Sequence, residues 1–332
     1  MIALRLHDVR DLRLHDEPEP TAAPDEVLVR VSAVGLCGSD LHWFENGSIG
    51  DTAIERPLVL GHEFVGMVEE GPRAGERVVL DPAIACGRCQ ACLGGDEHLC
   101  VDCRFAGHGS TDGALRELMP WPERLAVDLP ESLDDATATL LEPVGVALHA
   151  LDLADTRAQT SAAVVGCGPL GLLLVQLLRL EGIDVVATDP LRHRAEAAGD
   201  RGASTALVTA RADANDLPLV DVAFEVAGDD DALATAVDTV RPGGTVVLVG
   251  IPADDRHAFA ASVARRKGLT LRLCRRMRPE HLARAVALTE EHDLDLASLV
   301  SERFPLARGP EAFEALRARR GLKVVVEPRA AA

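Results

Sequence analysis

Alternating apolar and polar positions mark the first third of the chain as mainly β-structure. Residues 26–35, E-V-L-V-R-V-S-A-V-G, place apolar side chains at every second position, which is typical of a strand with one buried face. Similar short runs follow at 59–71 and 75–82, and the turn-rich segment 16–25 separates two of the strands. Short strands punctuated by Gly and Pro predict a partly open barrel or sandwich.

A different pattern begins at Ser161. Residues 162–180 read as a buried strand, a glycine turn and an apolar helix, and helical patterns follow at 191–199 and 231–240. Strands alternating with helices predict a doubly wound parallel sheet, so the fold class is α/β with a mainly-β domain in front of it. The further strands are expected at 183–189, 205–209, 220–228, 241–252 and 269–274.

The last fifty residues carry helical patterns at 280–289 and 311–318 and end on a strand at 322–328. This strand needs an antiparallel sheet to join, so we expect the tail to return to the first domain. The expected boundaries are 1–145 for the mainly-β domain, 146–280 for the dinucleotide-binding domain and 281–332 for the return.

Composition narrows the class of protein. The chain has 332 residues, of which 47% are apolar and 26% charged, which fits a two-domain globular enzyme. The formal net charge is -19, and Lys267 and Lys323 are the two lysines of the sequence. This balance argues against a nucleic-acid-binding surface, since phosphate contacts need a basic patch.

Two further features bear on location. The first ten residues carry charge where a secretory signal needs an apolar core, and the most apolar helical stretch, 170–180, is shorter than the about 20 residues that span a bilayer. We therefore expect a cytoplasmic protein with no membrane contact. In a reducing compartment, closely spaced cysteines hold metal more often than they form disulfides.

Four of the eight cysteines lie within fifteen residues. Cys86, Cys89, Cys92 and Cys100 follow a C-x2-C-x2-C-x7-C spacing. Four thiolates on a short loop can close a tetrahedron around zinc without leaving an open position. The spacing predicts a structural zinc site.

A second set of potential metal ligands lies between residues 37 and 63. Cys37 and His62 offer a thiolate and an imidazole, and either Glu63 or Glu142 could supply a third ligand. Three protein ligands leave one position open, where a metal can bind an alcohol oxygen and lower its pKa. The sequence thus contains the residues of a catalytic zinc site.

The glycine turn after the first strand of the second domain has the spacing G-x-G-x-x-G. Gly166 and Gly168 permit a tight turn close to a pyrophosphate, and Gly171 permits close packing of helix on strand. Asp189 ends the next strand, where its carboxylate can bind the ribose 2'-hydroxyl and would repel a 2'-phosphate, although Arg192 and Arg194 could offset that repulsion. NAD is favoured over NADP, and its site is expected to include Gly166, Gly168, Pro169, Leu170, Gly171, Asp189, Arg194, Val226, Val249 and Ile251.

Together these motifs resemble the zinc-dependent medium-chain dehydrogenase/reductase superfamily. The resemblance covers essentially the whole chain and rests on C-G-S-D-L-H, G-H-E-F-V-G, the four-cysteine loop, L-E-P-V-G and G-C-G-P-L-G. It implies a GroES-like catalytic domain, a Rossmann domain and a homodimer or homotetramer. The run G-S-I-G-D to R-P-L-V-L-G-H-E and the L-E-P motif resemble the polyol branch, which includes sorbitol, xylitol and L-idonate dehydrogenases.

By this resemblance Cys37, His62 and Glu142 bind the catalytic zinc, and Glu63 is a neighbouring carboxylate that can enter or leave coordination. The reaction it implies is reversible hydride transfer from a secondary alcohol to NAD. Ser39 can then receive the released proton and His42 can pass it to solvent. In the alternative interpretation, Ser39 only caps a helix that begins at Asp40.

The substrate is less well defined by the sequence. Trp43 stands where polyol enzymes commonly carry tyrosine, and the segment 104–115, which follows the four-cysteine loop, is short. An amino-cyclitol, L-threonine, a diol or an aldose are alternatives on the same scaffold. A non-catalytic NAD-binding protein is a further alternative, but the ligand residues that such a protein would lack are all present.

Overall fold

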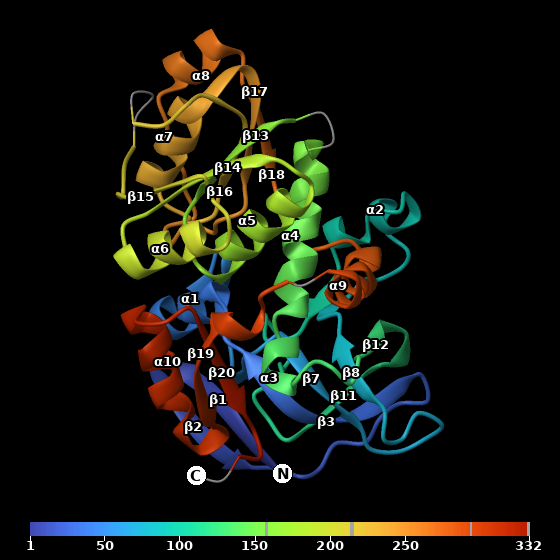
Figure 1. The fold of residues 1–332 in the computed structure, drawn as a ribbon. Coiled ribbons are helices and arrows are strands. Elements are labelled where there is room, and N and C mark those ends of the chain that lie inside the picture. Colours follow the sequence, from blue (N-terminus) through green and yellow to red (C-terminus); the bar gives the residue numbers. More distant parts are fainter. Residues whose placement is uncertain (157–158, 213–215, 293, 331–332) are drawn as a thin grey trace. The chain divides into compact units, whose positions relative to one another are not determined.

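The computed structural model describes residues 1–156, 159–212, 216–292 and 294–330, in which the chain forms two compact units (Figure 1). One unit joins Met1–Glu142 to Arg278–Ala332, and the other is Pro143–Met277. The C-terminal segment, red in Figure 1, therefore belongs to the same unit as the blue N-terminal strands.

The main sheet of the first unit has the strand order β12-β8-β7-β3-β20-β19, and β11 also pairs with β3. The last strand, β20, lies between β3 and the edge strand β19, antiparallel to β3 and parallel to β19. The strands of this sheet are β3 (Glu26–Gly35), β7 (Glu63–Val68), β8 (Arg77–Leu80), β11 (Leu118–Pro122), β12 (Ala126–Asp128), β19 (Val300–Pro305) and β20 (Lys323–Glu327).

Shorter sheets and helices surround it. A sheet with the order β2-β1-β6 and the pairs β4-β5 and β10-β9 complete the β-structure of the described residues in this unit. Their bounds are β1 (Ile2–Asp8), β2 (Asp11–Asp16), β4 (Ser48–Ile49), β5 (Thr52–Ala53), β6 (Leu58–Val59), β9 (Ala83–Ile84) and β10 (Arg104–Phe105). The helices are α1 (Gly38–Asn46), α2 (Gln90–Leu93), α3 (Asp135–Ala138), α9 (Pro279–Glu291) and α10 (Gly309–Ala318).

The alternation in β3 explains how this sheet is held. Val27, Val29 and Val31 point into an apolar core that also contains Phe64 and Trp121, whereas the residues between the valines are half-buried. Burying each large apolar side chain contributes about 1.5–3 kcal/mol. β3 is therefore a buried inner strand of this sheet, and it fixes the position of its neighbours β7 and β20.

The second unit contains the predicted doubly wound sheet, with the order β15-β14-β13-β16-β17-β18 and parallel pairing throughout. The order reverses direction between β13 and β16, which is where such sheets bind ligands. Its strands are β13 (Ser161–Val165), β14 (Asp184–Asp189), β15 (Thr205–Val208), β16 (Val220–Glu225), β17 (Val240–Leu248) and β18 (Thr270–Leu273). Its helices are α5 (Pro169–Leu180), α6 (Arg192–Asp200), α7 (Asp230–Thr239) and α8 (Ala261–Lys267), and α4 (Leu141–Ala154) precedes them.

We find no helix in the described ranges that is both long and apolar enough to cross a bilayer.

Candidate metal centres and dinucleotide site

The residues between β3 and β7 bring three potential metal ligands together. Cys37 follows β3 after one intervening residue, Leu36, and is the N-cap of α1, while Glu63 is the first residue of β7 and His62 precedes it. One donor atom from each of Cys37, His62 and Glu63 can be chosen so that all three lie within 4.8 Å of one another. A thiolate, an imidazole and a carboxylate at this spacing suit a zinc ion.

Asp40, which sequence reasoning missed, supports this group. Its Oδ2 accepts a hydrogen bond from the Cys37 N–H at 2.9 Å, and its Oδ1 accepts one from the Gly61 N–H at 3.2 Å. The same Oδ1 lies 3.6 Å from His62 Nδ1. Burial of the His62 ring opposes protonation, but the charge of Asp40 and its hydrogen bond raise the pKa of His62 well above its ordinary value. A carboxylate on the second ring nitrogen is the usual way to orient a metal-binding histidine.

Glu142 lies close to this group without belonging to it. It is the second residue of α4, it is only 5% exposed, and burial raises the pKa of its carboxyl to about 8, with the charge of His62 acting in the opposite direction. Distance favours Glu63 over Glu142 as the third ligand, because the cluster of donor atoms contains Glu63 and not Glu142. The Glu63 carboxylate also forms a buried ion pair with Lys323, another residue that sequence reasoning did not single out.

Ser39 and His42 both lie in α1. The Ser39 hydroxyl is 3.4 Å from His62 Nε2. Ser39 and His42 are three residues apart, so they share one side of the helix, and both are half-buried. Because the helix begins at Gly38 with Cys37 as its N-cap, the interpretation in which Ser39 caps a helix that begins at Asp40 is wrong.

Aromatic rings stand beside this cluster. The Phe105 ring lies 5.3 Å from the His62 ring, centroid to centroid. Trp43 is buried and meets the His108 ring edge-on at 5.4 Å. Trp43 is therefore held by packing within the first unit, and Phe105 comes from the short segment after the four-cysteine loop.

The four cysteines at 86–100 form a second cluster. Their Sγ atoms all lie within 4.8 Å of one another. The sulfur–sulfur distance is 3.5 Å for Cys89 and Cys92, 3.9 Å for Cys89 and Cys100, and 4.0 Å for Cys86 and Cys92. A tetrahedral zinc ion with Zn–S bonds of about 2.3 Å requires sulfurs about 3.8 Å apart. The distances thus match a zinc tetrahedron and are far too long for disulfide bonds.

Backbone N–H groups of this loop point to cysteine sulfurs and stabilise the thiolate form of Cys89. The N–H groups of Cys92 and Val101 lower the pKa of Cys89 to about 6, whereas burial and the neighbouring Cys89 sulfur raise the pKa of Cys92 to about 12. The Cys86 N–H also points to the Cys100 sulfur at 3.3 Å. Thiolate is the form that binds metal, so this arrangement favours metal binding over an inert apolar packing role.

The glycine turn of the second unit joins β13 to α5. Gly166 has φ 102°, in the region that favours glycine, and a Cβ at Gly171 would lie 1.9 Å from the Gly166 carbonyl oxygen. Gly168 is the N-cap of α5 and supplies no side-chain cap, and Pro169 and Leu170 open the helix. The first N–H groups of α5 are therefore available to an anionic ligand such as a pyrophosphate.

The other predicted cofactor residues follow the ends of neighbouring strands. Asp189 ends β14 and is buried, and its carboxylate accepts hydrogen bonds from the Cys167 and Leu191 N–H groups, each at 2.8 Å. Val226 follows β16, and Val249 and Ile251 follow β17. Because β14, β13, β16 and β17 are adjacent and parallel, these residues share the carboxyl edge of the sheet.

The two arginines after Asp189 differ in position. A guanidinium nitrogen of Arg194 lies 3.6 Å from where a Cβ of Gly168 would stand, so this arginine is close to the glycine turn. Arg192 is exposed and pairs with Glu196 at 3.6 Å. Only Arg194 is thus in place beside the turn.

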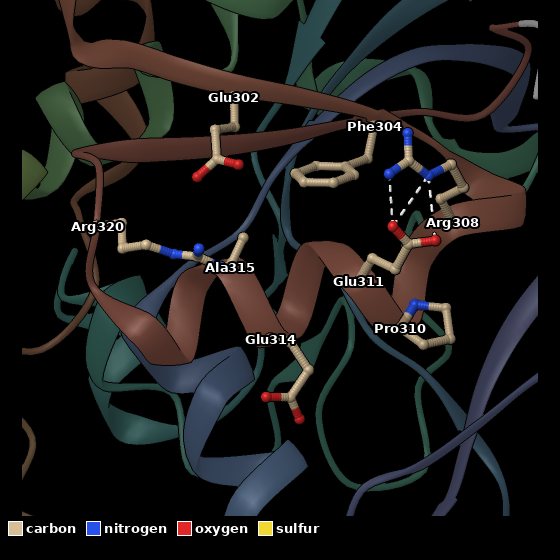
Figure 2. A pocket seen from close by; sticks show the side chains of 8 residues that line it. All are labelled: Glu302, Phe304, Arg308, Pro310, Glu311, Glu314, Ala315 and Arg320. Atoms are coloured by element: carbon tan, nitrogen blue, oxygen red, sulfur yellow. Dashed lines mark hydrogen bonds and ion pairs between the residues drawn. The ribbon is translucent and has the colours of Figure 1, made fainter.

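A surface pocket lies elsewhere in the first unit, between β19 and α10. Figure 2 shows the Phe304 ring and the Arg308 guanidinium on one side and Glu311 of α10 facing them. The Arg308 Nε donates to both carboxylate oxygens of Glu311 at 3.1 Å. The lining found in the described part of the chain includes none of the predicted site residues, so this pocket is separate from the metal clusters.

Comparisons with known proteins cover both units. Residues 23–131 match the family model of the alcohol dehydrogenase GroES-like domain, and residues 169–291 match that of the zinc-binding dehydrogenases. Sorbitol dehydrogenase of Bacillus subtilis (strain 168) is 36% identical over 77% of this chain and 76% of its own length.

Two solved structures extend the likeness over the whole chain. The 2R,3R-butanediol dehydrogenase from Bacillus subtilis is 29% identical with a TM-score of 0.86 and covers 99% of each chain. A structure from Sinorhizobium meliloti 1021, described as a zinc-binding dehydrogenase bound to NADP, is 29% identical with a TM-score of 0.87 over 98% of this chain and 99% of that one. The fold predicted from sequence, a GroES-like domain with a Rossmann domain, is confirmed. The protein therefore belongs to the zinc-dependent alcohol dehydrogenase family of medium-chain dehydrogenases, in its polyol branch.

Proposed function

We propose that the protein oxidises a secondary alcohol of a polyol or sugar-derived substrate, reversibly, and passes the hydride to NAD. The observation that carries this proposal is the group formed by Cys37, His62 and Glu63, whose donor atoms lie within 4.8 Å of one another. The sorbitol dehydrogenase relative supports a polyol as the substrate class. When bound, the zinc supplies a Lewis acid for the alcohol oxygen and NAD supplies the hydride acceptor.

The chain's own residues would hold this zinc with Cys37, His62 and one carboxylate. Glu63 is close enough, but its charge is already paired with Lys323. Glu142 is buried nearby, where the charges of His62 and Lys323 act on its carboxyl group. A metal ion at the same place would stabilise the buried carboxylate further, so we assign Glu142 as the third ligand and Glu63 as the neighbour that can exchange with it.

Removal of the substrate proton is assigned to α1. Ser39 stands 3.4 Å from the Nε2 of His62, so its hydroxyl is beside the place where an alcohol oxygen would lie. His42 is on the same side of the helix and half-buried, which allows it to exchange protons with solvent. We expect Ser39→Ala to lower kcat while zinc content and NAD binding are retained, and an unchanged kcat would remove Ser39 from this role.

NAD is proposed over NADP on the strength of Asp189. Its carboxylate is fixed beside the glycine turn by two backbone N–H groups and would repel a 2'-phosphate. Arg194 is the one nearby arginine that could soften this repulsion. The site is completed by Gly166, Gly168, Pro169, Leu170, Gly171, Val226, Val249 and Ile251.

We further propose two zinc ions per chain, one held by Cys86, Cys89, Cys92 and Cys100, and a homodimer or homotetramer. β18 is the last strand of its sheet and so presents an open edge, and Leu273 on it is 76% exposed. A cytoplasmic location fits the free thiols of the described cysteines, which a reducing compartment preserves.

The experiment that tests the function is NADH formation by the purified protein against polyols, sugar acids, diols, cyclitols and L-threonine, each repeated with NADP. Turnover of the polyols with NAD in preference to NADP is the expected result. Turnover confined to the diols, cyclitols or threonine would overturn the polyol assignment. Silence across the panel, with zinc bound, would overturn the proposed substrate class.

A further inference from the structure

A buried acid stands at the end of β16. Glu225 is the last residue of this strand and is 0% exposed. Its Oε1 accepts hydrogen bonds from the N–H groups of Ala227 at 2.8 Å and Gly228 at 2.7 Å. Its Oε2 has no hydrogen-bond partner in the part of the chain that the structure describes. Burial of a carboxyl group with one unsatisfied oxygen costs free energy, which sets Glu225 apart from an ordinary turn residue.

The main chain of Glu225 holds a second loop. Its carbonyl oxygen accepts the N–H groups of Val249 at 2.8 Å and Gly250 at 3.0 Å, directly after β17. The side chain thus fixes the loop after β16, and the carbonyl group fixes the loop after β17. These two loops contain the predicted cofactor residues Val226, Val249 and Ile251.

Close backbone packing connects these loops to the glycine turn. A Cβ at Gly228 would lie 2.4 Å from the Ile251 carbonyl oxygen, and a Cβ at Gly166 would lie 2.9 Å from the Ala227 nitrogen. Both glycines also have a positive φ, 75° for Gly228 and 102° for Gly166. The loop at 226–228 is therefore packed against both of its neighbours, and its shape affects the whole carboxyl edge of the sheet.

Asp189 has a similar place in the other half of the sheet. It ends β14 and accepts the N–H groups of Cys167 and Leu191, each at 2.8 Å. Doubly wound dinucleotide-binding sheets consist of two mononucleotide-binding halves, here β13–β15 and β16–β18. Asp189 belongs to the half that is assigned to the adenosine ribose. Glu225 belongs to the other half, which leaves the nicotinamide nucleotide for the loops that it holds.

We propose that Glu225 is a positioning residue of the dinucleotide site, which fixes the loops after β16 and β17 for the nicotinamide half of the cofactor. This inference rests on the proposed function, because it takes NAD as the ligand of this edge of the sheet. The Glu225 side chain is fully buried, so it acts through the loops that carry Val226 and Val249. Loops that already have their bound shape lower the cost of ordering the site when the cofactor binds.

The test compares two substitutions of Glu225. Glu225→Met keeps the length of the side chain but removes its acceptor oxygens, whereas Glu225→Gln keeps one acceptor oxygen for both N–H groups. The Kd for NADH is measured from the fluorescence of the bound cofactor, and the Kd for ADP, which carries the adenosine and phosphate groups only, by calorimetry. We expect Glu225→Met to raise the Kd for NADH about tenfold or more and to change the Kd for ADP by less than about twofold. Glu225→Gln should keep the Kd for NADH within about twofold of the wild-type value.

Asp221, at the opposite end of β16, offers a matched control. Its Oδ2 also accepts two backbone N–H groups, from Thr160 at 2.8 Å and Ser161 at 3.1 Å, but it does so at the amino edge of the sheet. Asp221→Leu is expected to lower thermal stability and to leave the Kd for NADH unchanged. If Glu225→Met does not fold, Glu225→Ala carries the test, because the shorter side chain leaves space for water to bind the two N–H groups.

The outcomes separate this inference from the proposed function. A wild-type Kd for NADH in folded Glu225→Met would overturn the positioning role. Equal weakening of NADH and ADP binding, or a Glu225→Gln protein that binds NADH as weakly as Glu225→Met, would also overturn it. A wild-type protein that binds NADH but oxidises no alcohol would overturn the proposed function, while the two Kd values would still report on Glu225.

Discussion

Replacing Asp40 by asparagine is the most informative single change at the proposed zinc site. The substitution keeps the size of the side chain but removes its charge and one acceptor oxygen. Asp40 now accepts the Gly61 N–H with one oxygen, which also faces His62, and the Cys37 N–H with the other. If the amide oxygen of asparagine keeps the first position, its NH₂ group must face the Cys37 N–H, and two donors then oppose each other.

The magnitude follows from these contacts. A buried donor left without an acceptor costs about 1–3 kcal/mol of folding free energy. Loss of a carboxylate that orients a metal-binding histidine typically costs about 10–100-fold in metal affinity, equivalent to about 1.4–2.7 kcal/mol. We therefore expect Asp40→Asn to weaken zinc binding at the Cys37–His62 site by about one to two orders of magnitude.

The assay is competition for zinc with a chromogenic chelator, run beside thermal unfolding. Asp51→Asn, at an exposed aspartate in the β4–β5 turn, is the matched control and should leave both measurements unchanged. Zinc affinity in Asp40→Asn equal to that of the wild type, in a folded protein, would refute the claim that Asp40 orients His62.

The remaining predictions concern the loop, the cofactor and pH. Cys89→Ser should remove one zinc per chain and lower the thermal midpoint, and unchanged zinc content would contradict the four-cysteine assignment. Asp189→Ser should move cofactor preference toward NADP, measured as the ratio of kcat/KM values, and an unmoved ratio would count against Asp189. Burial favours the protonated form of Asp112, but the hydrogen bond from Arg5 stabilises the carboxylate and lowers the pKa of Asp112 below the ordinary 3.8. The stability that the Asp112 carboxylate contributes is therefore full above pH 3.8 and is lost as the pH falls through the lowered pKa. Asp112→Asn should therefore be less stable than the wild type by about 1.5–3 kcal/mol at pH 7, and the gap should close in strong acid; a gap that persists there would contradict this reading.

Local sequence was sufficient to predict the features that depend on spacing. The four-cysteine loop and the glycine turn are each written within about fifteen residues, and their geometry follows from short-range chain constraints. The parallel sheet followed from the alternation of strands and helices, and Cys37 and His62 from their motifs. These features need no knowledge of which strand pairs with which.

The rest depended on pairing that the sequence does not reveal. The contact of Lys323 with Glu63 exists only because β20 and β7 flank β3. Asp40 was within the C-G-S-D-L-H motif, yet its role required the N-cap geometry of α1 to be seen. A signal was available in one case, since an aspartate three residues after an N-cap suggests a capping box.

The central claim is that the site at Cys37 carries the reaction and the four-cysteine loop does not. It is tested most directly by NADH formation from the polyol panel, measured for the wild type and for Cys37→Ser at equal protein concentration. The account predicts turnover by the wild type, and no turnover by a folded Cys37→Ser protein that keeps the zinc of its four-cysteine loop. Turnover by Cys37→Ser at the wild-type rate would contradict it.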